Sequence, residues 1–345
     1  MSLLRPGPDT AAARLFKELS EAGVPTIGDL ARRLETPPGA RASKVQRAVM
    51  EAPRALADAS RLGLAILPFQ ASGYPERLRQ LPDPPIVLWI RGCAEALDSP
   101  AVAIVGSRTA TPTGISVATR LGRELSDAGL VVVSGLARGV DAAAHRGALD
   151  GSGRTVAVLG SGADVIYPPE HASLARQILE RGAIVSELPP GTPPRPRHFP
   201  LRNRIISGLA RAVVVVEASL KSGSLITAKA ALEQGRDVLA VPGNVISGRH
   251  CGCHALIKDG ARLVETVDDV LDELQWPREP VRPPPRVNAL QLSGLEGRMA
   301  VGEPYSLDEL ADATGRAAQD LLAELGTLEL AGRVERRAGS LFVRT

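Results

Sequence analysis

The chain has 345 residues, of which 44% are hydrophobic and 23% are charged, and its formal net charge at pH 7 is only +3. This length predicts two or three domains with sizeable buried cores. The small net charge excludes the global basicity of many nucleic-acid binders, so any site for a polyanion must be local. Three cysteines without a framework of spacings exclude a disulfide scaffold. There is no apolar signal-peptide core and no membrane-length apolar run, which predicts a cytoplasmic protein.

Residues 1–65 carry leucines and valines at helical spacing. The stretch "EAGVPTIGDLARRL" places a glycine-containing turn between two amphipathic segments, as in SAM-like and helix-hairpin-helix modules. Such modules often hold nucleic-acid backbones. A plain helical packing domain is the alternative interpretation of this region.

Residues 66–276 change character. Six nearly continuous apolar runs are typical of strands buried on both faces, at 101–105, 130–134, 155–159, 183–186, 212–216 and 237–241. Helical segments separate them, at 113–128, 140–149, 169–181, 203–210 and 224–235. Strand and helix in regular alternation predict an α/β fold, a Rossmann-like doubly wound parallel sheet.

The C-terminal part begins after a proline-rich linker, 277–287. Residues 288–345 contain two helical segments and then a hairpin-like stretch, the order of a winged-helix domain. Ser306 and Glu309 have the spacing of a capping box at the first of these helices.

The loops after the predicted strands are rich in small residues. Ligands of open parallel sheets bind at the carboxyl ends of the strands, where small residues and helix N-termini admit phosphate. The candidates are Gly106, Ser107, Arg108, Ser134, Gly135, Ser222, Gly223, Ser224 and Thr227. The run "GSRTAT" lacks the glycine pattern of a dinucleotide site and no Walker lysine is present, so no cofactor is expected.

A basic stretch, "RPRHFPLRNR", spans residues 195–204. It contains the candidate site residues Arg195, Arg197, Phe199, Arg202, Asn203 and Arg204. No Asp or Glu occurs between Glu187 and Glu217. This imbalance predicts that something negatively charged binds here; a solvated loop anchored to the core by Phe199 is the alternative.

Six motifs resemble the DNA-processing protein A family (DprA, also called Smf) in content and order, over residues 100–265. They are "AIVGSR", "SGLARGVDAAAH", "TVAVLGSGADVIYP", "FPLRNRIISGL", "VVVVEASLKSGSLITAKAALEQGRDVLAVPGN" and "LIKDGA". The resemblance implies a homodimer that binds and protects incoming single-stranded DNA and loads the RecA recombinase during natural transformation. A single-strand-binding protein is a further partner expected on the same ground. His254 stands where the family commonly has asparagine.

The resemblance favours DNA contact at the basic stretch, because single-strand binders combine cationic side chains with an aromatic platform for a base. It also implies a phosphate contact by Arg108, for which helix capping or a salt bridge is the alternative.

Two further patterns could indicate catalysis or metal binding. Asp141 and His145 have the spacing of an acid–base pair, but helix capping and local bonding are favoured over catalysis. His250, Cys251, Cys253 and His254 are too crowded for a tetrahedral metal site, so no metal is expected.

A nucleotide hydrolase is the alternative function. Phosphoribohydrolases with a similar Rossmann-like domain carry their catalytic glutamate in a G-G-x-G-T-x-x-E motif. The corresponding stretch here, "SGSLITAKAA", keeps the small residues and has Lys229 or its neighbours at the glutamate position. The sequence therefore predicts phosphate binding without catalysis, and no catalytic residue is assigned.

Overall fold

The computed structural model describes residues 52–277, 295–299, 302, 304–337 and 341–344. The chain divides into two compact units, Met1–Pro277 and Arg278–Thr345. The predicted N-terminal helical domain lies outside the described residues, apart from a helix over residues 52–61 and the segment that follows it. Among the described residues, no helix combines the length and hydropathy needed to cross a membrane.

The first unit is built on a nine-stranded sheet in the order β1-β2-β6-β5-β4-β3-β7-β8-β9. Its strands are β1 Ala65–Pro68, β2 Val87–Gly92, β3 Ala101–Val105, β4 Val131–Ser134, β5 Thr155–Val158, β6 Ala183–Ser186, β7 Ala212–Val215, β8 Asp237–Ala240 and β9 Arg262–Leu263. From β6 to β9 all neighbours are parallel. The predicted doubly wound α/β fold is confirmed, with an antiparallel β1–β2 edge added to it.

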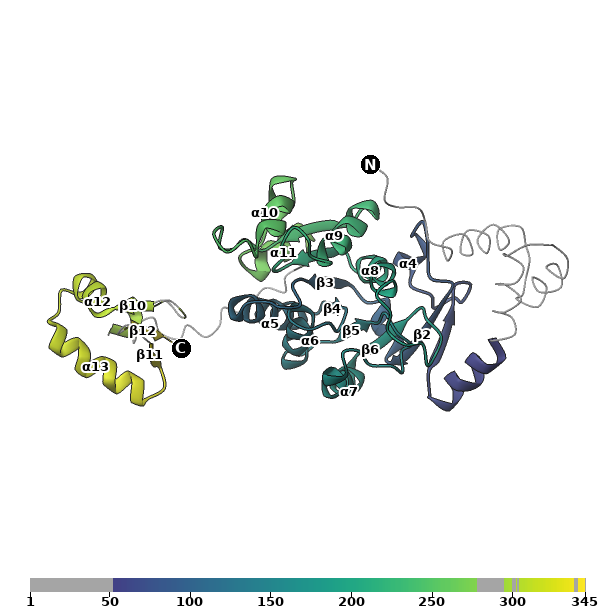
Figure 1. The fold of residues 1–345 in the computed structure, drawn as a ribbon, viewed down its shortest axis with the longest axis horizontal. Helices are drawn as coiled ribbons and strands as arrows, with labels where there is room; N and C mark the ends of the chain where they lie inside the picture. The colour runs from purple at the N-terminus through teal and green to yellow at the C-terminus, as the bar shows by residue number, and fades with distance from the viewer. Residues whose placement is uncertain (1–51, 278–294, 300–301, 303, 338–340, 345) are drawn as a thin grey trace. The chain divides into compact units, whose positions relative to one another are not determined.

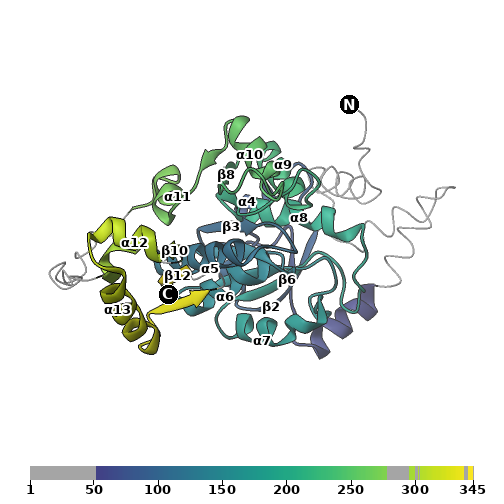
Figure 2. The same cartoon turned by 60° about the vertical axis from the view of Figure 1, so that its left-hand side comes forward.

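Helices cover both faces of this sheet (Figures 1 and 2). They are α4 Glu76–Arg79, α5 Pro112–Asp127, α6 Val140–Asp150, α7 Ala172–Arg181, α8 His198–Leu209, α9 Ser224–Glu233, α10 Cys251–Lys258 and α11 Val267–Glu273, with short 3₁₀ turns at Ala94–Leu97 and Pro169–His171. Successive residues of β3 point to opposite faces. Val102 and Ile104 pack with α5 and α6, whereas Ala103 and Val105 pack with α8.

The topological switch point of the sheet lies at β3, which has β4 on one side and β7 on the other. The chain leaves β3 through α5 to β4, and it reaches β7 only after α8. The carboxyl ends of β3 and β7 therefore flank the crevice in which open α/β sheets bind ligands.

Helix α8 begins at His198, five residues before the predicted start at residue 203. Pro200 lies in its first turn, where a missing N–H costs little because those N–H groups have no partner within the helix. The early start places residues 198–204 of the basic stretch in the helix. Its inward face carries His198, Arg202, Ile205, Ile206 and Leu209, which are all buried.

The second unit contains a three-stranded sheet in the order β10-β12-β11 and two helices. Its elements are a 3₁₀ turn Leu295–Arg298, β10 Pro304–Ser306, α12 Leu307–Thr314, α13 Ala318–Leu330, β11 Val334–Arg337 and β12 Leu341–Arg344. The predicted capping box is confirmed: Ser306 Oγ accepts from the Glu309 N–H at 3.2 Å, and Glu309 accepts from the Ser306 N–H at 2.7 Å. The predicted order of helix, helix and hairpin is likewise confirmed.

Candidate nucleic-acid interface

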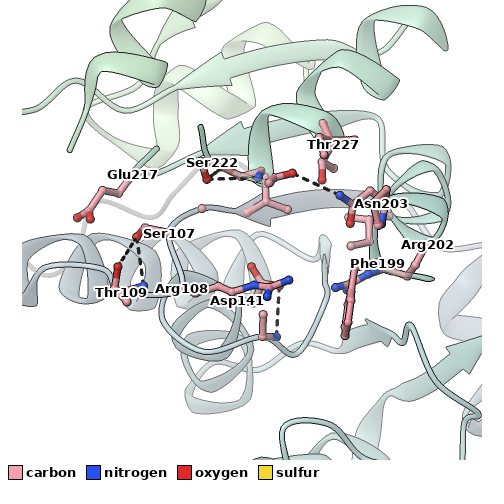
Figure 3. Close-up of a pocket in the computed structure, with 18 of the residues that line it drawn as sticks. Ser107, Arg108, Thr109, Asp141, Phe199, Arg202, Asn203, Glu217, Ser222 and Thr227 are labelled. Carbon is pink, nitrogen blue, oxygen red and sulfur yellow. Dashed lines mark hydrogen bonds between the residues drawn. The ribbon is translucent and has the colours of Figure 1, made fainter. Parts of the chain in front are cut away.

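A pocket of about 800 Å³ opens at the carboxyl edge of the sheet, beside the ends of β3 and β7 (Figure 3). It brings together ten of the predicted site residues: Gly106, Ser107, Arg108, Phe199, Arg202, Asn203, Ser222, Gly223, Ser224 and Thr227. The other five, Ser134, Gly135, Arg195, Arg197 and Arg204, do not line it. Ten of the fifteen predicted residues therefore meet at one pocket, although they come from segments that are far apart in the chain.

Phe199 forms the centre of an aromatic and cationic cluster at one side of the pocket (Figure 3). Its ring centroid lies 5.8 Å from that of Tyr167, and the two rings are tilted by 46°. The guanidinium carbon of Arg108 lies 5.2 Å from the centre of the Phe199 ring. Phe199 is half-buried and lines the pocket, so the ring is held in place while part of it remains exposed. This arrangement offers a stacking surface with a cation beside it.

Arg202 is buried beneath this cluster, although the sequence suggested a phosphate contact. Only 4% of its surface is exposed, and its Nη1 donates to the Val158 carbonyl at 2.8 Å. Burial lowers the pKa of Arg202 to about 10, while the Asp141 carboxylate opposes that shift. Its guanidinium carbon lies 6.0 Å from the centre of the Phe199 ring. Arg202 therefore packs against Phe199 from the buried side and helps to hold the ring in position.

Asp141 orders the loop between β4 and α6. Its Oδ2 accepts from the N–H groups of Gly135 at 3.1 Å and Ala137 at 3.3 Å, rather than capping α6 as the sequence suggested. Burial raises the pKa of Asp141, and Arg202 opposes that shift. Gly135 is needed here because a Cβ would collide with the Arg202 guanidinium. Ser134 has a structural contact as well: it is fully buried and donates to the Ile104 carbonyl at 2.7 Å.

The four arginines of the basic stretch divide into two pairs. Arg204 lies between two carboxylates, 2.5 Å from Glu187 and 3.4 Å from Asp83, so the expectation that no carboxylate offsets it is wrong. Its partners are distant in the sequence and come together only through the fold. Arg195 and Arg197 precede α8 and are exposed, next to Pro194 and Pro196 of the pocket lining. Charge accessible to a ligand therefore comes from the segment before the helix.

The start of α9 supplies hydroxyl groups and open backbone on the opposite side of the pocket from Arg108 and Asp141 (Figure 3). Ser222 Oγ and Ser224 Oγ lie 2.7 Å apart, and Asn203 Nδ2 donates to the Gly223 carbonyl at 3.4 Å. Gly223 is the N-cap residue and makes no side-chain capping bond. A Cβ at Gly223 would meet nothing within 4 Å, so the backbone is accessible. These features suit the approach of a phosphate.

The sequence analysis did not predict every residue of the pocket lining, and two of those it missed, Arg249 and Glu217, are ionisable. Arg249 follows β8 and donates to the Thr109 carbonyl at 3.0 Å, which adds an exposed cation to the lining. Glu217 is 1% exposed and accepts from the N–H and the hydroxyl of Thr111. For Glu217 a signal existed, because it is the first polar residue after a buried strand that ends at the switch point.

The histidines and cysteines that the sequence analysis considered for catalysis or metal binding contact neighbouring protein groups. His145 is fully buried and its Nδ1 lies 2.7 Å from Thr155 Oγ1. His254 Nε2 lies 3.1 Å from the Gly243 carbonyl, and burial raises the pKa of Cys253 to about 11. Within the described part of the chain, no three His, Cys, Asp or Glu side chains gather as a metal-binding group.

The sequence matches two family models. Residues 65–275 match the family described as DNA recombination-mediator protein A, and residues 297–340 match the DprA winged helix domain. Among curated proteins, the chain is 45% identical to DNA processing protein DprA of Streptococcus pneumoniae, over 59% of this chain and 72% of that protein. It is 41% identical to protein Smf of Escherichia coli, over 77% of this chain and 74% of that protein.

Two solved structures are similar in fold. DNA processing protein A from Streptococcus pneumoniae superposes with a TM-score of 0.67 at 37% identity, covering 77% of this chain and 92% of that one. DNA processing protein A from Helicobacter pylori gives a TM-score of 0.56 at 30% identity, covering 61% and 95% of the two chains. The second structure is described as revealing a single-stranded DNA binding mode.

Proposed function

Because the chain belongs to the DNA recombination-mediator protein A family, we propose that it binds single-stranded DNA in the pocket at the carboxyl edge of its sheet. The observation that carries this proposal is the cluster of Phe199 and Arg108 beside the small, polar start of α9. A base stacks on Phe199, while Arg108 and the hydroxyl groups of Ser222 and Ser224 contact the adjoining phosphates.

The polyanion reaches the pocket along its exposed cations. Arg195 and Arg197 lie next to the lining on the Phe199 side, and Arg249 belongs to the lining itself. Arg202 and Arg204 contribute indirectly, because the first supports Phe199 and the second is neutralised by Asp83 and Glu187. Stacking needs an unpaired base, so a single strand binds better than a duplex.

The affinity for labelled single-stranded and double-stranded oligonucleotides, measured across a salt series, tests this proposal. We expect tighter binding of the single strand at every salt concentration, with log K falling linearly against log salt. Equal affinity for the duplex, or binding that does not respond to salt, would contradict it.

We also propose that the protein acts as a homodimer that hands bound strands to the RecA recombinase during natural transformation, with a single-strand-binding protein as a further partner. These finer assignments rest on family membership alone. Sedimentation of the protein with RecA, with and without a single strand, tests the partner, and sedimentation of the protein alone tests the dimer.

We propose no turnover of nucleotides at this site. Both carboxylates of the lining are engaged: Asp141 accepts from two backbone N–H groups, and Glu217 accepts from Thr111. Lys229 is 61% exposed in an ion pair with Glu233 and lies outside the lining. A general acid needs access to the substrate. Purified protein should release no free base from AMP or CMP, and release that is lost in a Ser222→Trp variant would refute this proposal.

A further inference from the structure

The helices α5 and α9 both begin at the carboxyl edge of the sheet, and different groups accept hydrogen bonds from their first N–H groups. Thr111 caps α5, where its side chain accepts from the Gly114 N–H at 3.1 Å. A carboxylate from another strand adds to this cap: Glu217 Oε2 accepts from Thr111 N at 3.0 Å and from Thr111 Oγ1 at 2.7 Å. At the start of α9 the N-cap residue is Gly223, and the Ser224 N–H donates to the hydroxyl of Ser222 at 3.3 Å. A side-chain carboxylate therefore lies at the N-terminus of α5, whereas neutral hydroxyl groups lie at that of α9.

The backbone around Glu217 is shaped to admit this side chain. A Cβ at Gly114 would lie 2.6 Å from Glu217 Oε2, so a larger residue in the first turn of α5 would expel the carboxylate. A Cβ at Gly106 would lie 3.0 Å from the Glu217 carbonyl oxygen, so glycine also lets the ends of β3 and β7 close on each other. Glu217 is 1% exposed as a result.

The place that Glu217 fills is the one where open α/β sheets bind a ligand's phosphate. That place is the N-terminus of the helix after the strand at the switch point, which here is α5 after β3. A buried carboxylate weakens the attraction between this pocket and a negatively charged ligand. The presence of Glu217 in a pocket proposed to bind a polyanion therefore needs a physical explanation. Like charges repel strongly at a buried site.

We propose that Glu217 is an internal substitute for a phosphate group, which closes the anion position at α5 to free nucleotides and to terminal phosphates. The pocket then accepts phosphodiester groups only away from the N-terminus of α5, in the space between Arg108 on one side and the start of α9 on the other. Glu217 is thus a specificity-determining residue that lets the site select a continuous strand over free nucleotides. This role rests on the proposed function of the pocket.

Two variants separate the charge of Glu217 from its volume. Glu217→Gln keeps the size and an acceptor for Thr111 but removes the charge, and Glu217→Ala removes all three. The matched control is Glu233→Gln, which removes one charge from a side chain that is 61% exposed on α9. The probes are inorganic phosphate and 5′-dAMP at constant ionic strength, with binding measured by calorimetry and by the shift in thermal unfolding.

We expect Glu217→Ala to gain affinity for both probes by about tenfold, because it opens the position and removes the repulsion, so that a charge-assisted hydrogen bond to phosphate can form. Glu217→Gln removes only the repulsion and still fills the position, so it should gain less. Phosphate should also raise the melting temperature of Glu217→Ala, since it satisfies the N–H groups left without a partner. Glu233→Gln should bind both probes no more tightly than the wild type does, and phosphate should not raise the melting temperature of either protein.

Glu217→Ala decides the question, and Glu217→Ser takes its place if the alanine variant does not fold. A small variant with a wild-type circular dichroism spectrum and no gain in affinity for phosphate or 5′-dAMP overturns the proposal, as does a wild type that binds these probes as tightly as that variant. Single-strand binding by the wild type is measured on the same samples. Its absence would remove the proposed function but would leave the result for Glu217 intact.

Discussion

At the residue scale, Phe199 offers the clearest separation of stacking from charge. Its ring is held by Tyr167 and by Arg108, and it carries no charge itself. Phe199→Ala should weaken single-strand binding by about 1–3 kcal/mol with little change in the salt dependence, because stacking releases no counterions. Fluorescence anisotropy at several salt concentrations measures both quantities. Phe199→Tyr keeps a ring and is the matched control, so an equal loss in both variants would exclude stacking.

His145 makes a prediction about stability and pH. Its Nδ1 pairs with Thr155 Oγ1, which donates to the Val132 carbonyl, while its Nε2 is buried and has no partner among the residues that the structure describes. Burial lowers the pKa of His145 from 6.5 to about 3. Between these two pH values the unfolded chain binds a proton at His145 and the folded chain does not. The folded state therefore keeps its full stability above pH 6.5 and loses stability as the pH falls towards 3.

The free energy of unfolding should fall with a slope of up to about 1.4 kcal/mol per pH unit over that window from this one group. Urea unfolding between pH 4.5 and 7.5 measures the slope. His145→Asn cannot titrate there and should show a smaller slope than the wild type. An unchanged slope in the variant would show that other groups cause the acid sensitivity.

At the scale of one element, the start of α8 separates the exposed arginines of the basic stretch from the buried and half-buried ones, so it decides which of them can contact the proposed DNA ligand. Arg195→Ala with Arg197→Ala removes two exposed charges before the helix. The slope of log K against log salt should become shallower by about 1.4, at about 0.7 per lost phosphate contact on a single strand. The control pair, Arg123→Ala with Arg176→Ala, removes two exposed charges from α5 and α7 outside the lining and should leave the slope unchanged.

Arg204 should behave differently from that pair. Its guanidinium lies between Asp83 and Glu187, each of which is about one-fifth exposed. Arg204→Ala removes the ion pairs that this guanidinium makes with both carboxylates and should lower the free energy of unfolding by about 1–3 kcal/mol. Chemical denaturation measures this loss. A stable Arg204→Ala variant with a reduced salt slope would instead make Arg204 a phosphate contact.

The same helix shows what the sequence could and could not reveal. Six buried β-branched runs predicted the parallel sheet, because apolar strands of this kind need cover on both faces. The predicted helix starts at residue 203, whereas α8 starts at His198 and has Pro200 in its first turn, where proline fits. With the start at His198, helical spacing alone places Arg202 on the inward face. The pairing of Arg204 with Asp83 depends on tertiary contacts that no local pattern contains.

At the scale of the whole molecule, the C-terminal unit should contribute little to single-strand affinity. From residue 286 to the end, the chain has seven Lys and Arg against nine Asp and Glu. Helix α13 occupies the position of a reading helix, and Arg316 just before it is paired with Glu324 of α13 at 2.5 Å. Phosphate contacts dominate affinity for nucleic acid, and this balance opposes them.

Part of α13 is better suited to contact with protein. Leu321 and Leu325 form the core of the unit, whereas Leu330 is 92% exposed and Leu322 is 46% exposed. A chain that ends at Pro277 keeps the whole nine-stranded sheet and the pocket. It should lose less than about tenfold in single-strand affinity, or 1.4 kcal/mol. A larger loss, in a shortened chain whose circular dichroism still reports the folded sheet, would assign the C-terminal unit a direct part in holding the strand.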